Sequence, residues 1–131
     1  MSIAKMIAAH PDVEGDLNEA LALAVRHAMF CAAICTSCAD ACVAEKMVEE
    51  MRQCIRTCLD CSDVCAAAAR LATRRTGGNE ILLEEMLQLC ITACDICAEE
   101  CERHDHDHCR LCAEMCRECA RDCRAALETF H

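Results

Sequence analysis

Four segments of the sequence repeat one arrangement of cysteines. In the segment CIRTCLDCSDVC, residues 54–65, the cysteines occupy relative positions 0, 4, 7 and 11. Because an α-helix turns by about 100° per residue, these four side chains share a stripe roughly 60° wide. The same spacing occurs three more times, and Cys109 extends the last stripe by one turn, so that all 17 cysteines belong to the pattern. The stripes are Cys31, Cys35, Cys38 and Cys42; Cys54, Cys58, Cys61 and Cys65; Cys90, Cys94, Cys97 and Cys101; and Cys109 with Cys112, Cys116, Cys119 and Cys123.

Binding of a soft metal ion is the chemistry that this pattern favours. Cu(I) prefers thiolate and thioether ligands, and its filled d shell imposes little directional demand. Two thiolates hold one ion and a thiolate bridges two, so a row of thiols suits many ions. Each monovalent ion also neutralises one thiolate, whereas a divalent metal at the same ratio accumulates positive charge in the core. We therefore expect many Cu(I) ions per chain.

Other uses of cysteine fit the pattern less well. Helical neighbours have Cβ atoms about 5–6 Å apart, too far for a disulfide, and the number of cysteines, 17, is odd. Packing of cysteine as a small hydrophobe explains burial but not the repeat. Zinc sites are separate sets of four ligands, and the ferredoxin motif of iron-sulfur proteins is absent. Zinc or another soft metal, and a thiol redox protein, remain the alternatives.

The elements that carry the stripes are predicted to be long helices. The composition is 55% hydrophobic with two Phe, no Trp or Tyr, three Gly and one Pro, which favours helices over strands. Short turns imply an all-α fold, an antiparallel up-down-up-down four-helix bundle with a cysteine-lined core. Asn79 is the expected N-cap of the third helix and Gly77 the expected stop of the second. A single domain, 1–131, is expected to contain an N-terminal segment, 1–15, and a bundle, 16–131, with helices at 16–44, 47–75, 80–103 and 107–129.

Residue counts from the turns place the stripes at matching levels. Around residue 77, Cys65, Cys61, Cys58 and Cys54 stand 12, 16, 19 and 23 residues away on one side, against 13, 17, 20 and 24 for Cys90, Cys94, Cys97 and Cys101. Around residue 105, the fourth stripe similarly matches the third. The thiols should thus fill the core near the turns at 45 and 105. An apolar plug should close the other end, formed by Leu17, Leu21, Leu71, Leu82, Leu83, Leu127 and Phe130.

Methionines and histidines surround the expected mouth of this core. Met47 and Met51 precede Cys54 by 7 and 3 residues, so they continue its stripe toward the turn. The neighbouring turn contains the segment HDHDH, with His104 and His108 as the favoured ligands and His106 as a weaker candidate. Thioether and imidazole bind Cu(I) more weakly than thiolate, so these groups suit transfer of an ion inward. The alternatives are core packing for the methionines and a solvated loop for the histidines.

Two further candidate ligands lie near the plugged end. His27 and Met86 each stand four residues before a stripe, at Cys31 and Cys90. We favour a hydrogen-bonded histidine and a core methionine at these positions.

Charge and the N-terminal residues restrict the class of protein. The net charge of −10 argues against a nucleic acid or an anionic membrane as partner, since both attract clustered basic residues. No export signal is recognisable, and no apolar run is expected to reach the roughly 20 residues that span a bilayer. We therefore expect a cytoplasmic protein with reduced thiols. An enzyme is not expected, because a di-iron bundle needs inward glutamates and a thiol oxidoreductase needs an exposed CxxC pair.

The repeated CxxxCxxCxxxC motif resembles that of the bacterial copper storage proteins. Because no export signal is recognisable, the chain resembles the cytosolic branch of that family. The four copies, from Cys31 to Cys123, cover most of the chain. This resemblance implies a four-helix bundle that stores Cu(I) and assembles as a homotetramer. It also implies a mouth with Met and His ligands, which Met47, Met51, His104, His106 and His108 supply.

Overall fold

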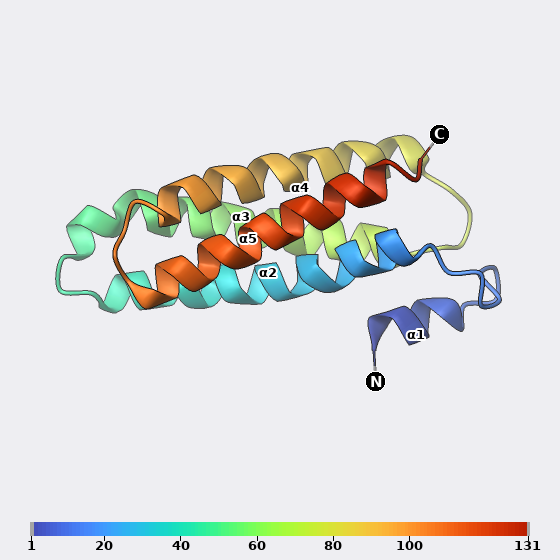
Figure 1. The fold of residues 1–131 in the computed structure, drawn as a ribbon, viewed down its shortest axis with the longest axis horizontal. Helices are drawn as coiled ribbons and strands as arrows, with labels where there is room; N and C mark the ends of the chain where they lie inside the picture. Colours follow the sequence, from blue (N-terminus) through green and yellow to red (C-terminus); the bar gives the residue numbers. More distant parts are fainter. Residues whose placement is uncertain (1, 131) are drawn as a thin grey trace.

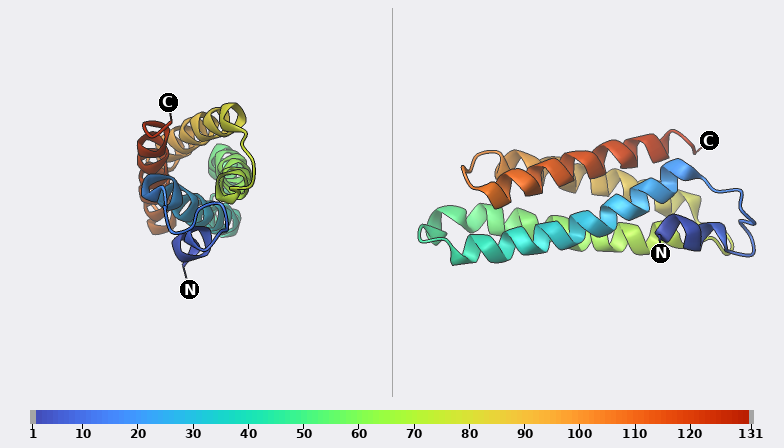
Figure 2. Two further views of the ribbon diagram at one scale, coloured as in Figure 1. Left: turned by 90° about the vertical axis from the view of Figure 1, so that its right-hand side faces the viewer. Right: turned by 60° about the horizontal axis from the view of Figure 1, so that its bottom comes forward.

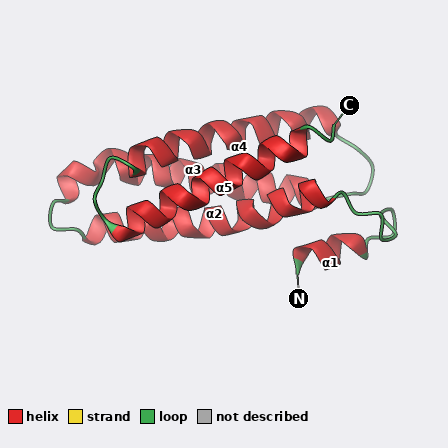
Figure 3. Cartoon of the chain, viewed as in Figure 1, coloured by secondary structure: helices red, strands yellow, loops and turns green. Residues whose placement is uncertain are grey.

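Four long helices form an antiparallel bundle in the computed structural model, which describes residues 2–130 (Figures 1 and 3). The described residues contain no β-strand. The all-α, up-down-up-down prediction is confirmed. The elements are α1 (Ile3–Ala8), α2 (Glu19–Ala44), a short 3-10 helix η1 (Val48–Met51), α3 (Arg52–Thr73), α4 (Glu80–Cys101) and α5 (Asp107–Leu127).

The long helices pack in a ring in the order α2, α3, α4, α5 and back to α2. The end-on view in Figure 2 shows these four helices surrounding one core. The α2–α3 and α4–α5 connections lie at one end of the bundle, and the α3–α4 connection lies at the other end with the C-terminus (Figure 1). The predicted turns near 45 and 105 therefore share one end.

Local capping moves the predicted helix starts. Helix α2 begins at Glu19 rather than at residue 16, because the side chain of Asn18 accepts a hydrogen bond from the Leu21 backbone N–H at 3.1 Å. Helix α3 begins at Arg52 rather than at 47, since η1 occupies the preceding turn. The last turns are also shorter than predicted, with ends at 73, 101 and 127 instead of 75, 103 and 129.

Two predicted cap residues behave differently in the structure. Asn79 directly precedes α4, as expected, but its side chain makes no capping hydrogen bond. Gly77 does not stop α3, which ends at Thr73 with an extended Arg74 after it. Gly77 instead has φ of +68° in the α3–α4 loop, a conformation that glycine adopts without the penalty of a side chain.

Helix α1 was not predicted within the N-terminal segment. The Ser2 hydroxyl accepts a hydrogen bond from the Lys5 N–H at 3.1 Å and caps this short helix. Ile7 is 3% exposed, and α1 packs against α2. Six residues are too few for a helical period to be visible in the sequence, so packing against the bundle decides this helix.

The closed end of the bundle is packed mainly by small residues. Of the predicted plug, Leu21 is buried and Leu17, Leu71, Leu83, Leu127 and Phe130 are partly buried. Leu82 was a wrong prediction, because it faces outward and is 43% exposed. Leu87, five residues later on α4, fills the core instead at 1% exposed. Alanines complete this end, including Ala24, Ala28, Ala68, Ala72 and Ala126.

Helix α2 is long and apolar enough to cross a membrane by length and composition alone, contrary to the sequence expectation. Cysteine and alanine, which dominate its C-terminal half, count as apolar residues in that test. Length and composition do not separate a membrane-spanning helix from the core helix of a bundle, and here α2 packs against α1, α3 and α5.

Candidate metal centre

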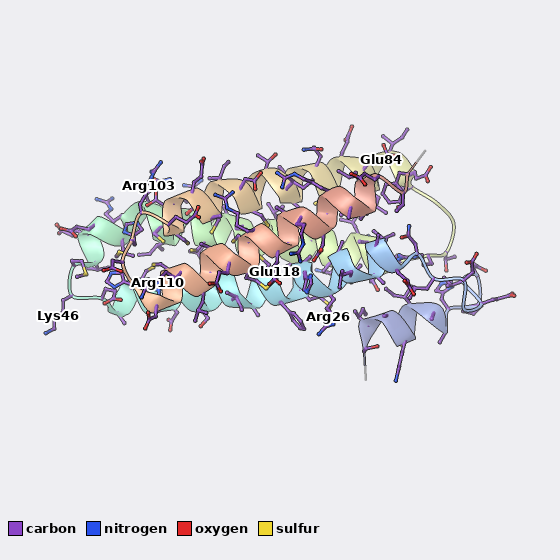
Figure 4. All side chains as sticks on the ribbon, viewed as in Figure 1. Arg26, Lys46, Glu84, Arg103, Arg110 and Glu118 are labelled. Atoms are coloured by element: carbon purple, nitrogen blue, oxygen red, sulfur yellow. The ribbon has the colours of Figure 1, made fainter. Side chains whose placement is uncertain are left out.

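All 17 cysteines, which were predicted to be the metal ligands, lie in the core of the bundle. Each is a free thiol, and each is 0% exposed except Cys38 at 2%. Charged side chains such as Arg26, Glu84 and Glu118 project outward from the helices (Figure 4). Because every stripe points inward while the charged face points out, the helical phase read from the spacing is confirmed.

The predicted levels of the α3 and α4 stripes are also confirmed. Sulfur atoms of the matched residues lie 3.7–3.8 Å apart across this helix pair. Helices α2 and α5 close the column from the other side, where Cys116 Sγ lies 3.8 Å from Cys31 Sγ and 3.6 Å from Cys35 Sγ. The matched pairs are Cys54 with Cys101, Cys58 with Cys97, Cys61 with Cys94, and Cys65 with Cys90.

The thiols form overlapping groups of four rather than separate sites. In each group the sulfur atoms all lie within 4.8 Å of one another, and neighbouring groups share members. Shared members allow one thiolate to bridge two ions, as Cu(I) tolerates. Along the column these groups include Cys31, Cys61, Cys65 and Cys94; Cys31, Cys35, Cys61 and Cys116; Cys35, Cys97, Cys112 and Cys116; Cys38, Cys58, Cys101 and Cys112; and Cys38, Cys42, Cys54 and Cys109.

Burial favours the neutral thiol in this column. It raises the pKa of Cys42 and Cys109 above the ordinary value, and nearby thiols that compete for ionisation raise it further. Neutral thiols pack as small apolar groups, so the metal-free core remains well packed. The sulfur separations of 3.6–4.0 Å are far longer than the 2.05 Å of a disulfide bond. A metal ion therefore has to displace a proton from each thiol that it recruits.

His108 is the predicted histidine that reaches the sulfur column. Its Nδ1 accepts from the Cys38 thiol at 3.4 Å and lies 3.6 Å from Cys109 Sγ. Its Nε2 donates to the Glu45 carboxylate at 2.8 Å. Burial by itself lowers the pKa of His108, but the hydrogen bonds with Cys38 and Glu45 outweigh burial, so the pKa is raised.

The other residues predicted to line the mouth have different surroundings in the structure. Met51 is 1% exposed in the core, in line with the predicted stripe. Met47 is 42% exposed, because the α-helix that was expected to carry it begins only at Arg52. His104 pairs through Nε2 with the buried Glu100 at 2.7 Å rather than with a thiol. His106 lies beside His108 and shares its carboxylate partner.

A family model described as copper storage protein matches residues 17–128. The chain belongs to the copper storage protein family. The match covers the whole bundle from the residues before α2 to the end of α5.

Solved structures of copper storage proteins share both fold and sequence with this chain. A copper storage protein, Ccsp, from Streptomyces lividans, loaded with 10 copper equivalents, has 39% identity and a TM-score of 0.93, over 98% of this chain and 100% of that one. A cytosolic copper storage protein from Streptomyces lividans with five coppers has 43% identity and a TM-score of 0.84, over 86% and 96%. The Cu(I)-bound copper storage protein BsCsp3 has 33% identity and a TM-score of 0.69, over 78% and 92%.

A curated relative extends the family match. An uncharacterized cysteine-rich protein, YhjQ, from Bacillus subtilis is 36% identical over 95 residues, which cover 72% of this chain and 84% of that protein.

Two polar residues of this copper storage protein family member were missed by sequence reasoning. Asp122 is 4% exposed, and its carboxylate pairs with Nδ1 of His27. His27 is therefore hydrogen-bonded, as favoured from the sequence, and Met86 packs against the core. Glu45 follows α2 and pairs with His108. Asp122 is 95 residues from His27, and Glu45 is 63 residues from His108. Helical spacing alone therefore did not indicate either pair.

Proposed function

We propose that this chain stores copper in the cytoplasm by binding many Cu(I) ions to thiolates inside its bundle. The observation that carries the proposal is the core of 17 buried thiols, in which many neighbouring sulfur atoms from all four helices lie 3.6–4.0 Å apart. A site for one metal ion needs two to four thiolates, whereas this column has enough thiols to bind many ions. Storage rather than catalysis follows from that excess of equivalent ligands.

The proposed capacity is on the order of one ion per thiol. A Cu(I) ion carries the same charge as the proton that it displaces, so the buried column stays nearly neutral at any loading. A divalent ion at the same ratio adds one uncompensated charge per site to a core that disfavours charge. The ligand set of the proposal is the 17 cysteines of the four stripes.

His108 and Met51 complete this ligand set at the mouth. The two ring nitrogens of His108 face different surroundings, with Nδ1 toward the Cys38 thiol and Nε2 toward Glu45 at the surface. This position suits an imidazole that receives an ion and hands it to Cys38 or Cys109. Met47 and His104 lie off the column, so any part they take in loading is indirect.

The cytoplasmic location and the homotetramer of the proposal rest on the family. One relative is described as cytosolic, and a reducing compartment keeps thiols free to bind metal. Assembly is supported by an exposed apolar ridge on α4, where Leu82, Leu89 and Ile96 follow one another at seven-residue spacing and are 43–52% exposed. The proposal includes no nucleic-acid or membrane partner.

Anaerobic titration of the reduced protein with Cu(I), and separately with Zn(II), tests the proposed function. Gel filtration followed by metal analysis then gives the retained ions per chain and the assembly size. We expect copper retention well above four ions per chain and approaching the number of thiols. Retention of one to four zinc ions with no larger copper load would overturn the proposal in favour of a zinc protein.

The part of His108 is tested by the rate of loading. We expect His108→Ala to slow the first phase of Cu(I) uptake in stopped-flow experiments while the final copper content stays the same. His104→Ala is the matched control, because His104 pairs with Glu100 rather than with a thiol. Equal loading rates of the His108 variant and the unmodified chain would contradict the transfer role.

A further inference from the structure

Three potential metal ligands converge outside the thiol column, at the mouth of the bundle. Glu45 directly follows α2, His106 directly precedes α5, and His108 lies in the first turn of α5. The same carboxylate oxygen, Glu45 Oε2, lies 3.3 Å from Nδ1 of His106 and 2.8 Å from Nε2 of His108. All three side chains are about one-quarter exposed, so an ion from solution reaches them without unfolding.

The spacing of these atoms suits a tetrahedral ion. Zn²⁺ binds imidazole nitrogen and carboxylate oxygen at about 2.1 Å, which places neighbouring ligand atoms about 3.4 Å apart. The two nitrogen–oxygen separations, 3.3 and 2.8 Å, are both shorter than this edge, so a small outward shift of the ligand atoms makes room for the ion. The imidazole rings are nearly parallel, at 4°, so one ring has to turn for both nitrogens to face one ion. The outer torsion of histidine is broad, and such a turn costs little.

The donor set selects a different class of ion from the column. Two imidazoles and a carboxylate suit borderline divalent ions such as Zn²⁺ or Co²⁺, whereas Cu(I) prefers the thiolates below. One anionic ligand and two neutral ones leave a divalent ion with a single positive charge at a solvated rim. The same charge is far more costly in the buried column. The chain also carries a net charge of −10, which attracts cations to its surface.

His108 connects this rim to the column. Its Nε2 belongs to the rim cluster, and its Nδ1 faces the thiols of Cys38 and Cys109. An ion held through Nε2 fixes the ring that the proposed function uses to pass Cu(I) inward. Occupation of the rim therefore restrains the group through which copper loads.

We propose that Glu45, His106 and His108 form a rim site for a borderline divalent cation, and that its occupation slows Cu(I) loading. The first half of this proposal stands on the geometry of the three ligands, and the second half rests on the proposed copper function. Binding and loading are therefore measured separately.

Binding is tested with Co²⁺ and Zn²⁺ on the copper-loaded protein, whose thiols are already occupied. We expect about one divalent ion per chain, with a Co²⁺ spectrum of nitrogen and oxygen ligands that lacks the intense sulfur-to-cobalt charge-transfer absorption. Glu45→Gln and His106→Ala should each weaken binding by at least about tenfold, as loss of even outer ligands does in metal sites. His104→Ala should bind as the unmodified chain does.

The copper content of the same samples separates the two proposals. If the unmodified chain retains no copper, the storage function is overturned. The rim site can still be judged in that case, by comparing the Co²⁺ spectrum of the unmodified chain with that of its His106→Ala variant. Three results would overturn the rim site. These are absence of a retained divalent ion, binding by the Glu45 and His106 variants as tight as that of the unmodified chain, and a Co²⁺ spectrum dominated by sulfur ligation.

Loading is tested by comparing each protein with its own rate in the absence of zinc. Pre-incubation with one equivalent of Zn²⁺ should slow Cu(I) uptake by the unmodified chain severalfold and leave the rate of His106→Ala unchanged, since that variant keeps His108 but loses the rim. Equal slowing of both proteins would show that zinc acts at the thiols and would overturn the regulatory half of the proposal.

Discussion

Cu(I) loading should release about one proton for each thiol that it recruits. Burial raises the pKa of thiols such as Cys42 and Cys109 above the ordinary value of 9.0. A thiol with that ordinary value is only about 1% ionised at pH 7, and burial opposes ionisation of each of the 17 thiols, so we expect them to hold almost all of their protons. Complete loading at one ion per thiol then replaces up to 17 protons with 17 monovalent ions. The net charge of −10 should remain constant throughout.

Two measurements check this prediction. Titration of lightly buffered, anaerobic protein with Cu(I) and a pH indicator gives the protons released per copper ion, and native electrophoresis gives the change in net charge. We expect a ratio near one and an unchanged mobility. Release of far fewer protons, or a mobility that shifts with each ion, would refute the reasoning that neutral thiols become the ligands.

The direction of the pH dependence follows from the same shifts. A raised thiol pKa means that protons compete strongly with the metal, so the affinity for Cu(I) should fall as the pH is lowered. For each proton displaced per ion, the apparent affinity should fall about tenfold per pH unit while the thiols are neutral. Competition with a copper chelator at pH 5 and pH 7 measures this change, and equal retention at both values would contradict it.

The remaining predictions concern the scaffold, and urea unfolding of the metal-free protein measures each of them. Asp122→Ala removes the buried partner of His27 and should lower the free energy of unfolding by about 1–3 kcal/mol. Asp60→Ala is the control, because its pair with Arg56 is exposed, and it should lower the free energy of unfolding by less than about 1 kcal/mol. Leu87→Ala should cost about 2–5 kcal/mol because this fully buried side chain leaves a cavity, yet the copper content should not change. Gly77→Ala should cost about 1–2 kcal/mol because φ is +68°, while Gly78→Ala in the same loop, without a positive φ, should be near neutral; equal effects would contradict the backbone argument.

The thiol column was predictable from the sequence because helical geometry is periodic. Cysteines spaced by three and four residues must share one face of a helix, and residue counts from a turn set the level of each side chain. The pairing of Cys65 with Cys90 and of Cys54 with Cys101 required no information beyond these two rules. The direction of the stripes into one core followed from short connections between amphipathic helices.

The ends of the helices and the side chains in the loops were decided by the tertiary structure. Met47 leaves the predicted stripe because a 3-10 turn replaces the start of α3, and α1 forms only where Ile7 packs on the bundle. Among the histidines of the segment 104–108, His108 meets the thiols while His104 meets Glu100. Spacing along a chain determines which residues share a helix face, but loop conformation and contacts between distant segments determine which partner each remaining side chain finds.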